Sequence, residues 1–369
     1  MVRPSYSLTV SREDTAELRF ESADGVYSKA SLCHAETLLA DAVDIGASAN
    51  LYVHQGNYGV LPVLLAKSTD GEVVMTERSA RAVALAEHNV GLNQADNVSV
   101  LLRSEPPQES FDAAFYAPRP FESVASVKNQ VVSLTHCVKE GGLVFVGAEE
   151  NTGISRYEAF LSDVPGWSRP VASDDGVTVI AHTVDGSFDK EFDVEHGCTV
   201  SHGGAQAQFT AADGLFSKKS LDAGSAALLD STAFVDGERV LDACCGYGAI
   251  GILAGLQSDI DLTMSDNDVL ATAYADRNAS ANGVSASVVT RDCLSGFSED
   301  SFDRIVSNPP THAGRGVLEE LVIGARICLE DGGSLHMVYN EAVGLTALLE
   351  EHFAVETSSK DGFVVAEGC

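Results

Sequence analysis

Short apolar runs alternate with longer amphipathic segments between residues 239 and 340. Runs rich in apolar and β-branched residues predict strands at 239–245, 261–266, 286–292, 303–310 and 333–339. Periodic segments between them predict helices at 249–256, 269–283 and 317–329. Strands separated by helices of this length indicate right-handed crossovers and an α/β fold with a doubly wound, mostly parallel sheet. Ligands bind such sheets outside the carboxyl ends of the strands.

The chain also repeats itself. ADGVYSKASLCHAETLL, which begins at Ala23, returns as ADGLFSKKSLDAGSAALL at Ala212, an offset of 189 residues. Further matching residues recur at the same offset or at an offset two residues longer. The last of them is a Gly-Gly pair at 141–142, which returns at 332–333. This repetition predicts a tandem duplication, with one domain over residues 1–187 and a second over 188–369.

The charge is unusual for a globular chain. There are 54 Asp and Glu against 23 Lys and Arg, of which only 8 are Lys, so the net charge is −31. An acidic, Lys-poor surface resembles that of proteins from salt-accumulating halophiles, and we expect a haloarchaeal type of protein. At about 1 M salt the Debye length is only about 3 Å, so this charge does not exclude a nucleic-acid partner.

No apolar run approaches the roughly 20 residues that span a bilayer. The eight cysteines include no Cys-x-x-Cys pair, which favours a reducing compartment. His196, Cys198 and His202 have no second ligand pair at zinc spacing, so a strand and turn are expected there. We therefore expect a cytoplasmic protein with neither a membrane anchor nor a metal.

Three acidic positions follow successive strands of the second half. Asp242 precedes a turn with Gly246 and Gly248, where the backbone can approach a ligand and a helix N-terminus favours an anion. Asp266 could accept hydrogen bonds from both ribose hydroxyls, or could simply cap the next helix. Asp292 could hold an adenine amino group or act as a cap. Together the three acids describe a nucleoside-binding edge better than three separate caps do.

The most specific segment is Ser307-Asn308-Pro309-Pro310-Thr311-His312. The two prolines remove two backbone donors, so the preceding carbonyls are expected to escape a helical turn. Asn308 could then offer its side-chain oxygen beside the Pro309 carbonyl, as two acceptors for one planar amine. Such acceptors orient the amine's lone pair toward an electrophile and stabilise the developing positive charge. A proline-stopped loop is the simpler alternative.

These segments resemble a known family. DxxCGxG, an acid after the next strand and Asn-Pro-Pro are similar to class I S-adenosylmethionine-dependent methyltransferases that act on amino nitrogens. GLFSKKSLDAGSAALL, SNPPTHAG and a degenerate copy in front resemble the RsmC/RlmG group of ribosomal RNA guanine-N2 methyltransferases. The resemblance implies two tandem Rossmann-like methyltransferase domains, of which the first is degenerate.

The resemblance also implies roles for individual residues. Asn308 and Pro309 would be catalytic, and Asn308 with Pro310, Thr311 and His312 would bind the substrate. The cofactor S-adenosylmethionine would be bound by a larger set: Asp242, Cys244, Gly246, Gly248, Asp266, Asn267, Asp292, Cys293, Phe216, Asp222 and Ser225. Two positions depart from the family pattern, since Cys244 replaces a usual Gly and Thr311 replaces the usual aromatic residue.

The first half keeps few of these residues. At the same offsets Asp242 becomes Val53, Gly246 becomes Asn57, and Asn308-Pro309-Pro310 becomes Ala117-Pro118-Arg119, while Glu77 alone keeps an acid at the ribose position. We expect this half not to bind the cofactor but to support the catalytic half and help to present RNA, or to act only as a packing partner.

The expected reaction is direct methyl transfer to an exocyclic amine, with N2 of a guanine in small-subunit ribosomal RNA as the target implied by the resemblance. The expected partner is ribosomal RNA or the small subunit, and the chain is expected to be a monomer. Two alternatives remain: methylation of another amine, such as a protein glutamine or a DNA adenine, and a non-catalytic module that binds the cofactor or RNA.

Overall fold

The computed structural model describes residues 2–11, 17–43, 46–108, 110–217 and 219–369. These residues form two compact units, Val2–Val194 and Glu195–Cys369. Residues 185–194, which lead from one unit to the other, contain no helix or strand. The boundary predicted at residue 187 falls inside this connecting segment.

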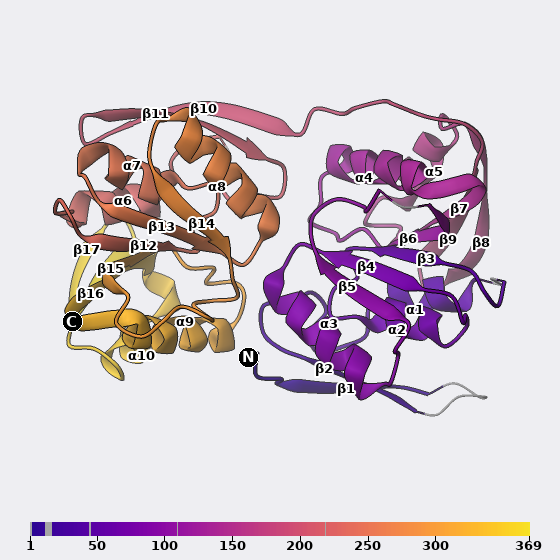
Figure 1. Ribbon diagram of the computed structural model, residues 1–369, viewed down its shortest axis with the longest axis horizontal. Helices are drawn as coiled ribbons and strands as arrows, with labels where there is room; N and C mark the ends of the chain where they lie inside the picture. Colours follow the sequence, from indigo (N-terminus) through magenta and orange to yellow (C-terminus); the bar gives the residue numbers. More distant parts are fainter. Residues whose placement is uncertain (1, 12–16, 44–45, 109, 218) are drawn as a thin grey trace. The chain divides into compact units, whose positions relative to one another are not determined.

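Each unit consists of an antiparallel hairpin followed by alternating strands and helices (Figure 1). The first contains β1 (Tyr6–Val10), β2 (Leu18–Ser22), α1 (His34–Asp41), β3 (Leu51–His54), α2 (Val60–Ala66), β4 (Val73–Glu77), α3 (Ala80–Leu92), β5 (Val98–Leu102), β6 (Phe111–Tyr116), α4 (Val124–Cys137), β7 (Val138–Glu149), α5 (Ile154–Leu161), β8 (Gly166–Asp174) and β9 (Val177–Val184). The second contains β10 (Glu195–His202), β11 (Ala205–Ala212), α6 (Ala223–Ser231), β12 (Arg239–Ala243), α7 (Ala249–Gln257), β13 (Asp261–Asp266), α8 (Val269–Ala281), β14 (Ala286–Thr290), β15 (Phe302–Ser307), α9 (Arg315–Cys328), β16 (Leu329–Asn340), η1 (Glu341–Val343), α10 (Thr346–Glu350), β17 (Val355–Lys360) and β18 (Phe363–Gly368).

The two main sheets have the same topology. Their strand orders are β5-β4-β3-β6-β7-β9-β8 and β14-β13-β12-β15-β16-β18-β17. In the second sheet β12 pairs in parallel with both β13 and β15, and only β18 runs against its two neighbours. The predicted doubly wound, mostly parallel α/β fold and its duplication are therefore confirmed.

Alternation along the central strands builds a core on each face of the second sheet. On β12, Val240 packs with residues of α6, α7 and α8, whereas Leu241 packs with residues of α9 and α10. Successive side chains of a strand point to opposite faces, so a strand buried on both sides is apolar almost throughout. This burial fixes the strand ends, and hence the loops that follow them.

Two asparagines clamp the second hairpin onto α8. Asn278 is buried, and its amide nitrogen donates to Thr210 O and Tyr247 O, both at 2.9 Å, while its side-chain oxygen accepts from Thr210 N. Asn282, one turn later, exchanges two hydrogen bonds with the backbone of Gln208. Asn89 and Asn93 make the same contacts with Glu21, Tyr58 and Arg19 in the first half.

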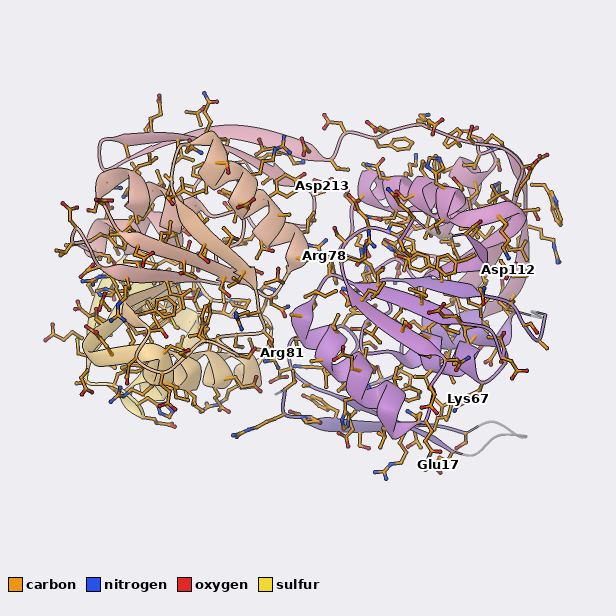
Figure 2. The ribbon with its side chains drawn as sticks, viewed as in Figure 1. Glu17, Lys67, Arg78, Arg81, Asp112 and Asp213 are labelled. Carbon is orange, nitrogen blue, oxygen red and sulfur yellow. The ribbon has the colours of Figure 1, made fainter. Side chains whose placement is uncertain are left out.

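The histidines considered as metal ligands lie on the hairpin. His196 and His202 are at opposite ends of β10, and His196 Nε2 lies 2.8 Å from Asp213 Oδ1. Asp213 is labelled in Figure 2. Within the described residues no group of three or more His, Cys, Asp or Glu side chains is arranged to hold a metal ion. None of the helices in the described part of the chain is long and apolar enough to cross a bilayer.

Replacing Asn278 with Ala should destabilise the protein by about 2–3 kcal/mol, because buried backbone groups of Thr210 and Tyr247 lose their partners. Thermal unfolding at molar KCl measures this. Asn282→Ala is the matched control and should cost less, since water can reach the exposed Gln208 groups. Equal costs for the two variants would contradict the proposed role of burial at Asn278.

Candidate functional site

Four segments meet at one edge of the second sheet. They are the loops that follow β12, β13, β14 and β15, whose strands are parallel and adjacent in the sheet. The carboxyl ends of parallel strands lie on the same edge, so residues far apart in sequence are brought together there. The site residues predicted from the strand ends lie in these loops or in the last two residues of their strands, where Asp242 is the second-last residue of β12 and Asp266 the last of β13.

The turn after β12 is a backbone cradle. Cys244, Gly246 and Gly248 have left-handed φ values of 60°, 55° and 91°. Gly246 N donates to Asp266 Oδ2 at 2.9 Å, which ties this turn to the end of β13. A Cβ added at Gly246 would meet no atom within 4 Å, so the space next to its Cα is open.

Asp266 is held by backbone donors rather than acting as a cap. Its Oδ1 accepts from Asp268 N at 3.0 Å, and the side chain that caps α8 belongs to Asp268. The capping alternative for Asp266 is therefore wrong. Both carboxylate oxygens of Asp266 thus accept from backbone N–H groups, which fixes the carboxylate at the end of β13. Asn267 lies directly beside it, half-buried.

Asp242 lies beneath the turn and is fully buried. Its Oδ2 accepts from Gly251 N at 2.8 Å, and its Oδ1 has no hydrogen-bond partner among the described residues. Burial raises the pKa of Asp242 to about 7, and the nearby negative charge of Asp266 acts in the same direction. A buried acceptor without a partner fits a site that is completed by a ligand or a water molecule.

The environment of Cys244 and Cys245 disfavours the thiolate form. Burial raises the pKa of both Cys244 and Cys245 well above the ordinary value, and neighbouring acids raise it further. Cys293 follows β14 beside Asp292, and both are half-buried. Because the thiolate is the nucleophile, this environment gives no support to covalent chemistry at Cys244 or Cys245.

Asn308 is held by two acceptors. Its amide nitrogen donates to Asp222 Oδ2 at 2.9 Å and to Ser225 Oγ at 3.0 Å. Asp222 also caps α6 by accepting from Ser225 N at 3.0 Å. The upstream segment that the sequence places over the cofactor thus contacts the catalytic candidate directly. A role for Asp222 and Ser225 in binding the cofactor stays a prediction.

The Asn-Pro-Pro segment forms no helical turn, but one of its carbonyls is engaged within the chain. Pro309 O accepts from Thr311 N at 2.8 Å, so a tight turn does engage this carbonyl. Pro310 has no N–H, but the next residue has one and closes the turn across it. The carbonyl oxygen of Pro309 has a second lone pair, so it can still accept a hydrogen bond from a ligand. Thr311 is half-buried and His312 is exposed.

Phe216 is 64% exposed, in the loop before α6. Tyr247, in the glycine turn, holds this loop by donating to Ser217 O and Ser220 O, both at 3.3 Å. Tyr58 makes the corresponding contacts with Ser28 O and Ser31 O in the first half. The loop and the turn therefore form one unit in both copies.

The first half has the same turn, but side chains fill it. Gln55 and Asn57 both have a φ of 51°, close to the values of Cys244 and Gly246. The Asn57 side chain occupies the position that is open above Gly246, and donates to Tyr27 O at 2.8 Å. Arg119, at the position of Pro310, pairs with the fully buried Glu77.

A further acid lies in this filled region. Burial raises the pKa of Glu36 to about 8, against the lowering effect of Arg119. Glu36 stands where the second half has Ser225, and Ala117 stands where it has Asn308. The first half therefore lacks both the open cradle and the amide that the second half holds in place.

Sequence reasoning missed three features of the site. It did not predict the ion pair between Arg119 and Glu77 or the hydrogen bond between Asn308 and Asp222. It also did not predict the asparagines that bind the hairpins to α3 and α8. The clamps had a visible signal, because Asn89 and Asn93 recur at Asn278 and Asn282 with the spacing that places two side chains on one face of a helix.

Asp242→Asn should change how stability depends on pH. The folded-state pKa of about 7 exceeds the ordinary 3.8, so the folded protein holds this proton more tightly than the unfolded chain. Wild-type stability therefore falls as the pH rises from about 4 to about 7, by at most about 4 kcal/mol. The variant does not lose stability in this way. The Tm of the variant minus the Tm of wild type should therefore be larger at pH 8 than at pH 5. An unchanged difference would mean that Asp242 titrates normally.

The chain is similar to curated proteins over two thirds of its length or less. A ribosomal RNA small subunit methyltransferase C from Pseudoalteromonas atlantica is 31% identical over 253 residues, covering 66% of this chain and 72% of the relative. The enzyme of the same name from Pasteurella multocida is 36% identical over 145 residues, covering 38% of this chain and 44% of the relative.

A solved structure has the same fold throughout. It is the 16S rRNA N2 G1207 methyltransferase RsmC from T. thermophilus, in complex with AdoMet and guanosine. It is 21% identical in sequence, has a TM-score of 0.81, and the match covers 98% of this chain and 97% of that one.

The family model described as the methyltransferase small domain matches the chain twice, at residues 17–181 and 206–367. The two matches correspond to the two halves of the duplication. The chain therefore belongs to the methyltransferase small domain family, in a two-domain form like that of the ribosomal RNA small subunit methyltransferases C.

Proposed function

We propose that the second half transfers a methyl group from S-adenosylmethionine to N2 of a guanine in small-subunit ribosomal RNA. The observation that carries this proposal is the juxtaposition of an open backbone cradle at Gly246 with an asparagine amide whose nitrogen is already engaged. The relatives named as small-subunit ribosomal RNA methyltransferases support this class of substrate, and the structurally similar N2 G1207 methyltransferase in complex with guanosine supports the choice of base.

The residues present suit the cofactor. The methionine part would lie against the turn at Gly246, where an added Cβ would meet no atom within 4 Å, and the carboxylate of Asp266 at the end of β13 would face the ribose hydroxyls. Asp242 lies beneath the turn, whereas Asp292 and Cys293 follow the neighbouring strand and would frame the adenine. When bound, S-adenosylmethionine supplies a methyl group on a positively charged sulfur, which is activated without a metal or a covalent enzyme intermediate.

The residues of the Asn-Pro-Pro segment would act on the amine. Asn308 Oδ1 and Pro309 O would accept its two hydrogens and direct its lone pair, while the partial negative charge of both oxygens stabilises the positive charge that develops on nitrogen. The base must leave its stack to reach this edge, which costs a few kcal/mol. Phe216 and His312, both exposed, are the side chains available to stack on it.

Further parts of the proposal concern the chain as a whole. We propose a monomer in the cytoplasm that acts on ribosomal RNA or the small subunit and works at high salt. The acidic, Lys-poor composition and eight free cysteines support this setting. The first half would hold the catalytic half and help to present RNA, without binding the cofactor.

Asn308→Ala should keep cofactor binding but lose at least about 100-fold in kcat, because one acceptor for the amine is removed. Labelled-methyl transfer at molar KCl measures this on small subunits and naked ribosomal RNA, with DNA and a protein glutamine substrate as comparisons. Turnover near the wild-type level would contradict the role of Asn308. Methylation of DNA or protein alone would support the alternative substrates, and binding without any transfer would support a non-catalytic module.

One cofactor should bind per chain, because Asn57 and Arg119 fill the corresponding region of the first half. Calorimetric titration of the full chain gives this stoichiometry. Asp266→Ala should abolish saturable binding, whereas Glu77→Ala, at the equivalent position of the first half, should leave it in place. Stoichiometric binding that survives Asp266→Ala would show that the first half also takes the cofactor.

A further inference from the structure

The amide of Asn308 can present only one kind of atom to a substrate. A primary amide has two N–H donors and one oxygen acceptor. In this site both hydrogens have acceptors, Asp222 Oδ2 and Ser225 Oγ. The side-chain oxygen accepts from no group among the described residues, so it is the polar atom of Asn308 left for a ligand.

The charge of Asp222 disfavours the reversed amide. Turning the group over would place its oxygen against the Asp222 carboxylate, which carries no donor when ionised, and would lose that hydrogen bond, whereas the Ser225 hydroxyl can donate as well as accept. The NH2 group would then face the substrate amine, donor against donor. The orientation of Asn308 therefore depends on two residues that lie more than 80 positions earlier in the chain.

The duplication supplies an internal comparison. In the first half the positions of Asn308, Asp222 and Ser225 are occupied by Ala117, Cys33 and Glu36. Helix α1 begins after Cys33 without a side-chain cap, whereas Asp222 caps α6. The cap, the hydroxyl and the amide are thus present together in one copy and absent together from the other.

We propose that Asp222 and Ser225 are positioning residues for methyl transfer, which fix the Asn308 amide with its oxygen toward the substrate and so select an amino group as the methyl acceptor. This inference rests on the proposed function of the second half. Asp222 also adds a negative charge behind the amide. A charged hydrogen bond to the N–H increases the electron density on Oδ1, which then stabilises the positive charge on the reacting nitrogen more strongly.

The inference separates catalysis from cofactor binding. Asp222→Ala should lower kcat by about 10- to 100-fold, because the amide can then turn and the acceptor is misplaced. Asp222→Asn retains an oxygen acceptor without the charge, so a smaller loss, about three- to tenfold, is expected. The positioning role replaces the cofactor-binding role that the resemblance implies for Asp222, so the cofactor Kd should stay within about twofold of the wild-type value in both variants.

A structural role alone would give a different result. Asp222→Ala also removes the cap of α6, so Ser123→Ala, which removes the cap of α4 in the first half, is the matched control and should leave kcat unchanged. The decisive comparison is the double-mutant cycle with Asn308→Ala. In the Asn308→Ala background, Asp222→Ala should lower kcat no further. An equal further loss in that background, or a cofactor Kd raised while kcat stays constant, would overturn the proposal.

The contact itself has a readout independent of turnover. Unfolding at molar KCl of Asp222→Ala, Asn308→Ala and the double variant should be non-additive, because both single changes break the same hydrogen bond. If wild type transfers no methyl group to any RNA, the proposed function fails whatever this cycle shows. If wild type is active but the stability effects simply add, the function stands and the positioning role fails.

Discussion

Parallel pairing of β12 with β13 and β15 is the constraint on which the site depends. It brings the turn with Gly246, the carboxylate of Asp266 and the amide of Asn308 to one edge, although they are separated by up to about 60 residues of sequence. The hydrogen bond from Gly246 N to Asp266 Oδ2 then ties two of the loops together. The rigid sheet, with a core on each face, determines where these loops start.

The two halves show that the fold and the site are separable. Both keep the strand order, the asparagine clamp on the hairpin, the tyrosine that holds the upstream loop and the left-handed turn. In the first half an ion pair between Arg119 and the buried Glu77, together with the Asn57 side chain, fills the region that a cofactor would need. The two halves thus share their strand order and the conformation of this turn, and differ in the side chains at the site.

The sequence was sufficient for the architecture because the apolar runs are strong and the copy repeats them. It also located every loop of the site, since acids, glycines and prolines directly follow the strands. The sequence did not show which side chains form hydrogen bonds or ion pairs with one another at that edge of the sheet. The hydrogen bond between Asp222 and Asn308 joins residues 86 positions apart. The ion pair between Arg119 and Glu77 joins residues 42 positions apart. The turn that engages Pro309 O was missed because prolines were considered only for the donors they lack, and not for the Thr311 N–H that follows them.

The central claim is that the second half alone holds a methyl donor opposite an amide oxygen that binds an amino group. A crystal structure of the full chain with a stable cofactor analogue and guanosine, grown at molar KCl, tests it most directly. The account predicts one analogue per chain, at the turn after β12, with guanine N2 within hydrogen-bond distance of Asn308 Oδ1. An analogue in the first half, or an Asn308 amide with its nitrogen facing the base, would contradict it.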